Sequence, residues 1–287
     1  MTSRPGRIVA VAAAAALGVA LFPPPGLATR APSARELTAL AAAYVRTYDG
    51  QLPAVVGEES HEQSLHERTA GRPARDESRH LRSTVAWVHL PRLSDTVAVR
   101  DVFEIDGHRI DGGPGLESLL RAPAATLENN VRDLLNRSAA HNLAPGSRNI
   151  NFPTFPLVYL RQAHVDRSRW RLPRGGPATI LSFQERGRPA IVRSESGSHL
   201  RARGRFWLDA GSGQVERAEV HLKGERVTYR LHVRFAHDER LALWLPSRME
   251  DVYERAWGFS YLRVTGTATY SNYRRFETEG RIVPPAR

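Results

Sequence analysis

Alternation of apolar and polar residues with a period of two dominates the second half of the chain and restricts its fold most strongly. The clearest case is the pair of segments 215–223 and 226–235, where apolar side chains stand at every second position. Side chains of a strand point alternately to the two faces of a sheet, so this period predicts strands with one buried face. We expect a hairpin with a type II′ turn at Gly224-Glu225, because glycine suits the first position of that turn.

A two-residue turn also fixes the register of this hairpin and sorts its side chains into two faces. On the polar face it pairs Glu219 with Arg230, which predicts that these two charges neutralise each other. On the apolar face six residues are candidate contacts for a hydrophobic ligand: Val220, Leu222, Val227, Tyr229, Leu231 and Val233. The alternative is that this face is a filled core, which is the usual state of an apolar sheet face.

The remaining patterns predict further strands and a few helices. Strands are expected over 81–88, 97–105, 178–185, 189–193, 204–209 and 259–270. An amphipathic helix is expected after Ser33, which forms a capping box with Glu36, and it should stop at Asp49-Gly50. Apolar residues at helical spacing predict a helical insertion near 113–165. The segment 52–66 is compatible with an extended conformation, whereas 61–79 is polar and predicts a loop. The chain is therefore assigned to the α+β class, with a single domain over residues 29–287.

Residues 1–28 are predicted to be a secretory signal peptide. Two arginines precede an apolar run over 8–22, three prolines follow it, and Gly26-Leu27-Ala28 offers small residues for cleavage. The run is shorter than the ~20 residues of a membrane-spanning helix. We therefore expect a periplasmic or secreted protein, with an uncleaved anchor or cleavage after Ala34 as the alternatives.

The chain contains no cysteine, which excludes a disulfide framework, a thiolate metal site and a cysteine nucleophile. Its net charge of +11 comes almost wholly from arginine, since Lys223 is the only lysine. Such a bias fits the coding habit of a GC-rich genome better than selection for phosphate contacts, which lysine also serves. We therefore expect no nucleic-acid partner.

The basic excess is concentrated between residues 151 and 205, where eleven arginines face three carboxylates. This segment is the candidate for contact with an anionic envelope surface. Trp170 could lie at such a surface because its ring is amphipathic. The candidate residues are Arg167, Arg169, Trp170 and Arg171. The alternative is a set of loops coated with solvated arginines.

The sequence offers no convincing catalytic or metal-binding motif, and we expect neither a metal nor another cofactor. Asp101 and Glu104 belong to a carboxylate-rich segment, but on a strand they point to opposite faces. His61 and His66 are five residues apart, whereas ligation of zinc from one helix requires a spacing of four. An enzyme remains an alternative, in which Asp101, Glu104 or a histidine supplies acid–base chemistry.

The segment 100–107, RDVFEIDG, resembles the RDVFEVDG signature of a bacterial family of secreted proteins with no assigned activity. The similarity continues over 134–142, 148–154, 206–209 with Gly213, 243–246 with Met249, and 270–276. The chain departs from this family after the Asp-Gly turn, where it has Asp111-Gly112-Gly113 in place of a more charged loop.

The order of helix, hairpins, helical insertion and long strands also resembles the lipoprotein carriers of the LolA and LolB type. That resemblance implies a curved antiparallel sheet, an incomplete β-barrel, wrapped around helices and an apolar cavity for acyl chains. It implies an exported, non-enzymatic protein that binds a lipid or a lipidated protein, although a shared fold does not transfer function. The alternatives are a hydrolase acting on the envelope and a structural protein docked on an anionic surface.

Overall fold

The computed structural model describes residues 31–53, 55–90, 95–110, 115–121, 123–144, 150–174, 179–194 and 196–276. The chain divides into two compact units, Met1–Ala31 and Pro32–Arg287, and every element below belongs to the second. The predicted signal peptide lies outside the described residues. Within those residues, no helix combines the length and the apolar character needed to cross a membrane.

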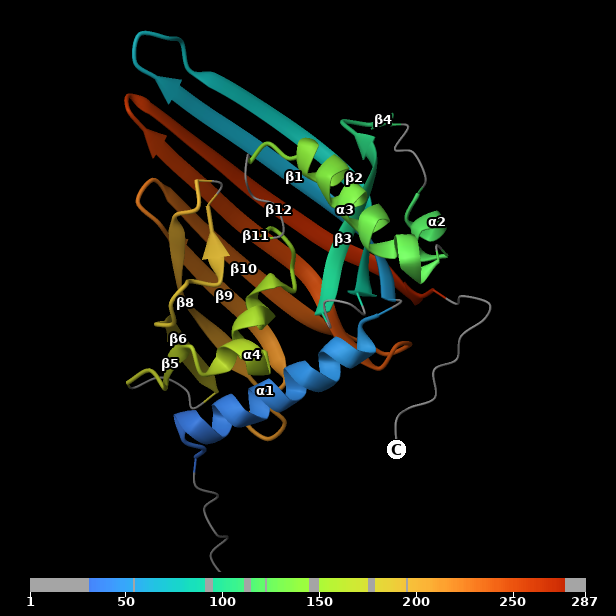
Figure 1. Cartoon of the computed structure of the whole chain (residues 1–287), viewed down its shortest axis with the longest axis vertical. Coiled ribbons are helices and arrows are strands. Elements are labelled where there is room, and N and C mark those ends of the chain that lie inside the picture. The colour runs from blue at the N-terminus through green and yellow to red at the C-terminus, as the bar shows by residue number, and fades with distance from the viewer. Residues whose placement is uncertain are drawn as a thin grey trace, which may run out of the picture. The chain divides into compact units, whose positions relative to one another are not determined.

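Twelve strands form one antiparallel sheet (Figure 1). Their bounds are β1 Val55–Thr69, β2 Arg75–Leu90, β3 Asp95–Ile105, β4 His108–Arg109, β5 Ser168–Arg171, β6 Ile180–Glu185, β7 Val192–Arg193, β8 His199–Leu208, β9 Val215–Lys223, β10 Val227–Asp238, β11 Leu243–Trp257 and β12 Ser260–Arg275. The helices are α1 Ala34–Gln51, α2 Leu116–Leu120, α3 Ala124–Ala140, the 3₁₀ helix η1 Phe155–Leu160, and α4 Gln162–Val165.

The strand order is β4-β3-β2-β1-β12-β11-β10-β9-β8-β6-β5, with β7 paired to β8 beside this path. Because β4 and β5 end the path, the described strands form an open sheet. An incomplete antiparallel barrel with a helical insertion was the expectation, and the sheet order fits it. The molecule is, however, more sheet and less helix than an ordinary α+β domain.

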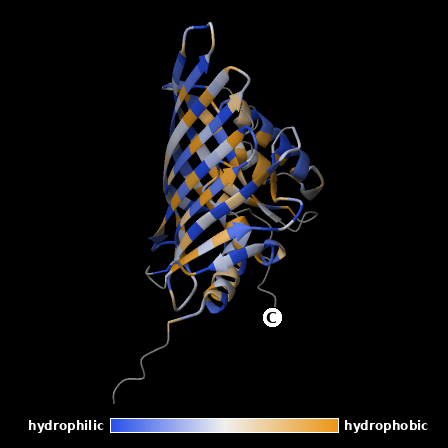
Figure 2. Ribbon diagram, turned by 90° about the vertical axis from the view of Figure 1, so that its left-hand side faces the viewer, coloured by the Kyte–Doolittle hydropathy of each residue, from blue (hydrophilic) through white to orange (hydrophobic). Residues whose placement is uncertain are grey.

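Both faces of the sheet carry apolar clusters, as alternation along β2 shows. Val85 and Trp87 belong to the larger cluster, which also contains residues of α1 and η1. Ala86 and Val88 point the other way and join α2 and α3 in a smaller cluster. We call these the inner and outer faces. The alternation along the strands is visible in Figure 2, and Figure 1 shows α1 crossing one end of the sheet.

Helix α1 confirms the predicted start. The Ser33 backbone N–H donates to the Glu36 carboxylate at 2.7 Å, and the Glu36 N–H donates to the Ser33 hydroxyl at 3.3 Å, which completes the capping box. Leu37, Ala41 and Val45 are fully buried, as expected for one stripe of an amphipathic helix. The helix continues to Gln51, slightly beyond the predicted stop.

The predicted β9–β10 hairpin forms, but its register differs from the prediction. Lys223 pairs with Thr228, and the Gly224 N–H donates to the Val227 carbonyl at 2.9 Å, so the chain turns at Glu225-Arg226, one residue later than predicted. Each residue of β9 consequently faces a partner two positions further along β10. Because a shift of two preserves the face of every side chain, the apolar and polar faces remain as predicted. Only the pairs change.

The loop predicted over 61–79 is wrong, because β1 runs to Thr69 and β2 begins at Arg75. The inward positions of β1 are occupied by Glu59, His61 and Gln63, all buried. Because these inward residues are polar, the strand lacks the alternation of apolar and polar residues by which it could have been predicted. They are stabilised by other buried polar groups, which no local pattern reveals.

Candidate functional site

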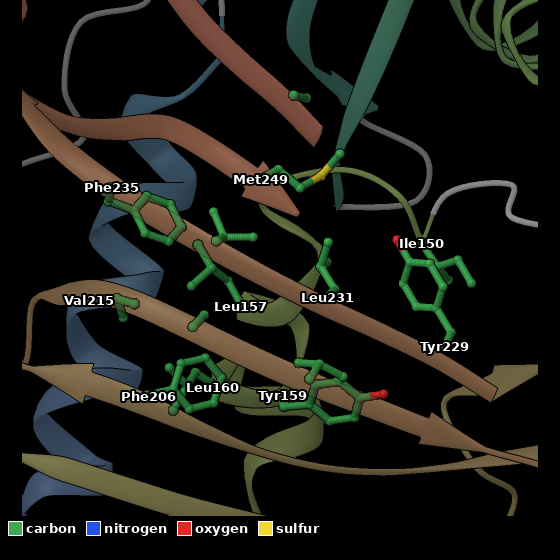
Figure 3. Packing of buried hydrophobic residues seen from close by; sticks show 14 of the residues in the cluster. Ile150, Leu157, Tyr159, Leu160, Phe206, Val215, Tyr229, Leu231, Phe235 and Met249 are labelled. Atoms are coloured by element: carbon green, nitrogen blue, oxygen red, sulfur yellow. The ribbon is translucent and has the colours of Figure 1, made fainter. Parts of the chain in front are cut away.

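The six apolar candidates lie on the inner face, where five of them are packed as core. Val220, Leu222, Tyr229, Leu231 and Val233 are each exposed by at most 1%. Figure 3 shows Tyr229 and Leu231 among Leu157, Tyr159 and Leu160 of η1, which fills this side of the sheet. The filled-core alternative therefore describes these five residues. Val227 differs, because it is only partly buried.

Val227 lines a cavity of about 390 Å³ beside the turn that connects β9 and β10. We call this cavity the end pocket. Its apolar wall consists of Ile150, Val192, Leu200, Val227 and Tyr253, which come from five separate segments. Ligand pockets commonly have volumes of roughly 300–1,000 Å³ and mostly apolar walls. The end pocket has such a volume, and its lining combines an apolar wall with a polar rim.

The rim of the end pocket is polar and mainly basic. Arg193, Arg226 and Arg255 line it, and Glu225 is the one carboxylate among its described lining residues. Ser194, Ser196 and Ser198 complete the rim, with hydroxyl oxygens 2.9 Å apart for the first two residues and 3.3 Å apart for the last two. Guanidinium and hydroxyl groups donate hydrogen bonds to anionic oxygens. The rim is thus suited to an anionic group.

A buried ion pair, Arg100 with Glu59, lies deeper under the inner face. The Arg100 guanidinium donates to both Glu59 carboxylate oxygens, to one of them at 2.7 Å, and to the Asn151 carbonyl at 3.2 Å. The Tyr270 hydroxyl donates to Glu59 at 2.8 Å. Arg100 also stacks over the Phe152 ring at 4.7 Å.

Burial by itself raises the pKa of Glu59, but the charge and hydrogen bonds of Arg100 outweigh burial and lower it. Glu59 in turn raises the pKa of Arg100 against the opposing effect of burial. Both groups are therefore held in their charged forms. A fully enclosed pair of this kind positions chain segments rather than substrates.

A second polar pair, His61 and Asp251, lies beside Gly266. His61 Nε2 and Asp251 Oδ1 are 3.7 Å apart, and neither atom has a hydrogen-bond partner in the described part of the chain. A Cβ at position 266 would lie 2.2 Å from Asp251 Oδ1 and 2.7 Å from His61 Nε2. Glycine is therefore needed here for steric reasons.

The carboxylates considered for acid–base chemistry do not meet in one cleft. The Asp101 carboxylate accepts a hydrogen bond from the Leu116 N–H at 2.8 Å, at the start of α2. Glu104 pairs with Arg82 at 3.4 Å on the exposed side of β2 and β3. Asp111 lies outside the described residues. The alternative of catalysis at this segment therefore lacks converging groups.

Histidines of the 61–66 segment are separated in the same way. His61 points into the core, whereas His66 is exposed and lies 2.7 Å from the Asp76 carboxylate. Among the residues that the structure describes, no three histidine, aspartate or glutamate side chains are grouped as metal ligands would be.

The four candidates for an anionic partner divide into two pairs. Arg169 and Arg171 are exposed on the outer side of β5. Trp170 points the other way, and its ring lies 5.4 Å from Phe183 while its N–H donates to the Val165 carbonyl at 2.8 Å. Arg167 donates to the Pro189 carbonyl. Alternation on β5 therefore places the partly buried Trp170 ring on the inner side, away from the face that carries Arg169 and Arg171.

The rim of the end pocket contains none of the residues that the sequence predicted for a site. Arg226 and Arg255 become neighbours because β10 pairs with β11, where Val227 faces Arg255. Ile150 reaches the same pocket from the insertion. The one local signal was the Gly224-Glu225 turn, which places Arg226 at a hairpin end.

The sequence matches no protein-family model and no curated protein. Three solved structures are similar to it over most of its length. The first is a LolA superfamily protein from Nitrosomonas europaea, with 10% identity and a TM-score of 0.28, where the match covers 86% of this chain and 96% of that chain. The second is a DUF1329 family protein from Desulfovibrio piger, with 13% identity and a TM-score of 0.35, covering 85% of this chain and 93% of that chain. The third is lipovitellin, in a structure titled for its lipid–protein interactions, with 8% identity and a TM-score of 0.35, covering 80% of this chain and 26% of that chain. At such TM-scores the likeness establishes neither a shared fold nor a shared function.

Proposed function

We propose that this protein binds an amphiphile with an anionic headgroup in the end pocket. The supporting observation is the placement of three arginines around the apolar wall formed by Ile150, Val192, Leu200, Val227 and Tyr253. An apolar chain gains by leaving water at such a wall, by about 25 cal/mol for each Å² that it buries. The headgroup stays at the rim, where guanidinium groups pair with its oxygens.

The site of action in this proposal is the cell envelope or the exterior. The predicted signal peptide over residues 1–28 supports it, and so does the absence of cysteine, which leaves no thiol to be oxidised there. The ligand would be a lipid, or the lipid group of a lipidated protein. The packed core means that such a ligand lies at the end of the sheet and not through its centre.

The first test is mass spectrometry of organic extracts from natively purified protein, in which we expect a co-purified amphiphile. The second is calorimetric titration with dodecyl phosphate below its micellar concentration. In the variant R226Q/R255Q we expect affinity for dodecyl phosphate to fall about tenfold, since hydrogen bonds to charged groups are lost. The affinity of the same variant for dodecyl maltoside, which has a neutral headgroup, should change little.

A matched control is R248Q/R263Q, which removes the same charge from the exposed outer side of β11 and β12. It should leave both titrations unchanged. Val227→Asp places a charge in the apolar wall, so it should weaken the binding of both dodecyl phosphate and dodecyl maltoside. The proposal fails if the native protein binds neither probe, or if the rim variant and the control behave alike.

A further inference from the structure

Beyond amphiphile binding, the outer face of the sheet carries an unusual concentration of positive charge. Two adjoining depressions of about 490 and 560 Å³ share Gln184, Arg203 and His221. Together their described linings hold eight arginine and lysine side chains against two carboxylates. None of these residues lines the end pocket. This surface, which we call the β6 trough, is therefore a separate feature.

The shape of the trough follows from side-chain length on neighbouring strands. Its floor is β6, whose outward residues Ser182 and Gln184 are short and uncharged. One wall is β5, with Arg169 and Arg171, and the other is β8, with the outward side chains of Arg201, Arg203 and Arg205. Neighbouring strands lie about 4.8 Å apart, so the two walls stand roughly 10 Å apart.

The register aligns several of these cations across the sheet. One row, which contains no carboxylate, runs from Arg169 through Gln184, Arg203 and His221 to Arg230. Of the two neighbouring rows on this face, one places Arg201 directly opposite Lys223, and the other places Arg205 opposite Glu219. Like charges in directly opposed positions destabilise a sheet. The arrangement therefore costs folding free energy, and a bound anion would offset that cost.

The two carboxylates of the trough are already engaged. Glu219 accepts a hydrogen bond from Arg205 at 2.7 Å. Glu185 is buried and accepts from the Ile191 and Ala202 backbone N–H groups at 2.7 and 3.1 Å. Glu219 does not reach Arg230 as predicted, because the later β9–β10 turn brings His221 opposite Arg230 instead.

The remaining trough cations repel one another. Arg171 and Arg186 lower the pKa of the exposed Arg169. Burial, followed by the charges of Arg203 and Arg230, lowers the pKa of His221, which accepts hydrogen bonds from Arg203 as a neutral ring. By contrast, the outer side of β10 to β12 is balanced, because Glu254 lies 3.4 Å from Arg230 and 3.6 Å from Arg263.

We propose that the β6 trough binds a linear anionic polysaccharide that lies along β6. Arginines recur along β8 at every second residue, a spacing of about 7 Å, which suits anionic groups repeated along an extended chain. The hydroxyl of Ser182 and the amide of Gln184 on the floor can exchange hydrogen bonds with sugar hydroxyls.

Two other polyanions fit the trough less well. Single-stranded nucleic acid is usually held by stacking of its bases on exposed aromatic rings. The one aromatic residue in the described lining, Phe183, is 4% exposed and already stacks between Tyr159 and Phe206. A bilayer surface would meet a recessed polar channel, with no exposed apolar side chain to insert among its lipids.

The test is fluorescence anisotropy with a labelled oligogalacturonate, a linear polyuronate, added to the full-length mature protein. We expect saturable binding that weakens as salt is added, because the contacts are exposed ion pairs. A neutral malto-oligosaccharide should not bind. In R169Q/R203Q the dissociation constant should rise about tenfold or more, whereas the control R248Q/R263Q should change it little.

A second variant separates binding from folding. Gln184→Glu places a carboxylate between Arg169 and Arg203, so thermal unfolding should occur at the same or a higher temperature. The same carboxylate repels a polyuronate, so affinity should still fall. The proposal is overturned if oligogalacturonate does not bind, if the trough and control variants bind equally well, or if single-stranded DNA or phosphatidylglycerol vesicles bind more tightly. R226Q/R255Q should bind oligogalacturonate normally, which distinguishes this site from the end pocket.

Discussion

Arg100 connects segments that are far apart in the sequence, and its surroundings explain several of the strings that resemble the secreted family. Arg100 begins the segment 100–107, Asn151 and Phe152 belong to 148–154, and Tyr270 begins 270–276. Met249 also lies here, since its sulfur is 3.6 Å from the Tyr270 hydroxyl oxygen. These strings therefore meet at one buried ion pair, where their role is structural.

Removal of one partner of this pair should be strongly destabilising. In Arg100→Met the Glu59 carboxylate would remain buried without its cation, so we expect a loss of about 3–5 kcal/mol in the free energy of unfolding. The double variant R100M/E59L should lose clearly less than the sum of the single changes. Arg82→Met is the control, because it breaks an exposed pair on the same strands and should cost at most about 1 kcal/mol. Urea unfolding measures all of these, and equal losses at Arg100 and Arg82 would contradict the interpretation.

The same pair makes stability depend on pH in the acid range. The pKa of Glu59 is lowered from its ordinary value of 4.5 by Arg100, so the folded protein binds fewer protons than the unfolded chain. The contribution of Glu59 is complete above pH 4.5 and is lost as the pH falls through the lowered pKa. The free energy of unfolding in R100M/E59L should consequently fall less steeply below pH 4.5.

At the scale of elements, local patterns found those with an apolar stripe and missed those whose inward side chains are polar. Helix α1 and the strand β9 have one clean apolar face and were predicted nearly to their ends. Residues 61–69 of β1 were not, because His61 and Gln63 face inward. The β9–β10 register was wrong because the loop is held by a backbone bond between Gly224 and Val227, which residue type does not reveal.

Gly213 allows α1 to pack closely against the chain that precedes β9, and substitution of this glycine tests that packing. It adopts φ +72, and a Cβ there would lie 2.3 Å from the Leu40 carbonyl carbon and 2.5 Å from the Ala41 nitrogen. Gly213→Ala should therefore cost ~1–2 kcal/mol for the left-handed conformation and a further amount for displacing α1. Gly71→Ala is the control, since Gly71 has φ +75 with nothing within 4 Å. If the two variants unfold at the same urea concentration, α1 does not pack against Gly213 as described.

At the scale of the whole molecule, neither proposed site could be predicted from the sequence, because both are products of strand order. The candidates Arg169 and Arg171 were named from a local run of charge. Their companion Arg203 becomes a neighbour only because β6 pairs with both β5 and β8. The end pocket similarly combines Ile150 from the insertion with Tyr253 from β11. A prediction of fold class does not contain such pairings.

The inner core buries several tyrosines, which come from elements far apart in the chain: α1, η1, β10 and β12. These are Tyr48, Tyr159, Tyr229, Tyr270 and Tyr273. Burial raises the pKa of each hydroxyl above its ordinary value of 10.0, and nearby carboxylates add to the effect. The folded protein therefore keeps protons that the unfolded chain releases. The stabilisation that these tyrosines contribute is complete below pH 10.0 and is lost as the pH rises above it.

We accordingly expect the tyrosinate absorbance of these residues to appear at a much higher pH than that of free tyrosine. It should then rise together with the loss of far-ultraviolet circular dichroism, because the hydroxyls ionise only when the protein unfolds. Tyr229→Phe removes one of these coupled protons, so the midpoint of alkaline unfolding should move to higher pH. Tyr261→Phe, which alters a partly exposed residue near the β11–β12 turn, should move it less. A gradual rise in tyrosinate while the circular dichroism stays native would mean that these hydroxyls reach water in the folded state. The inner face would then be an accessible cavity, and the ligand site would have to be placed there instead of in the end pocket.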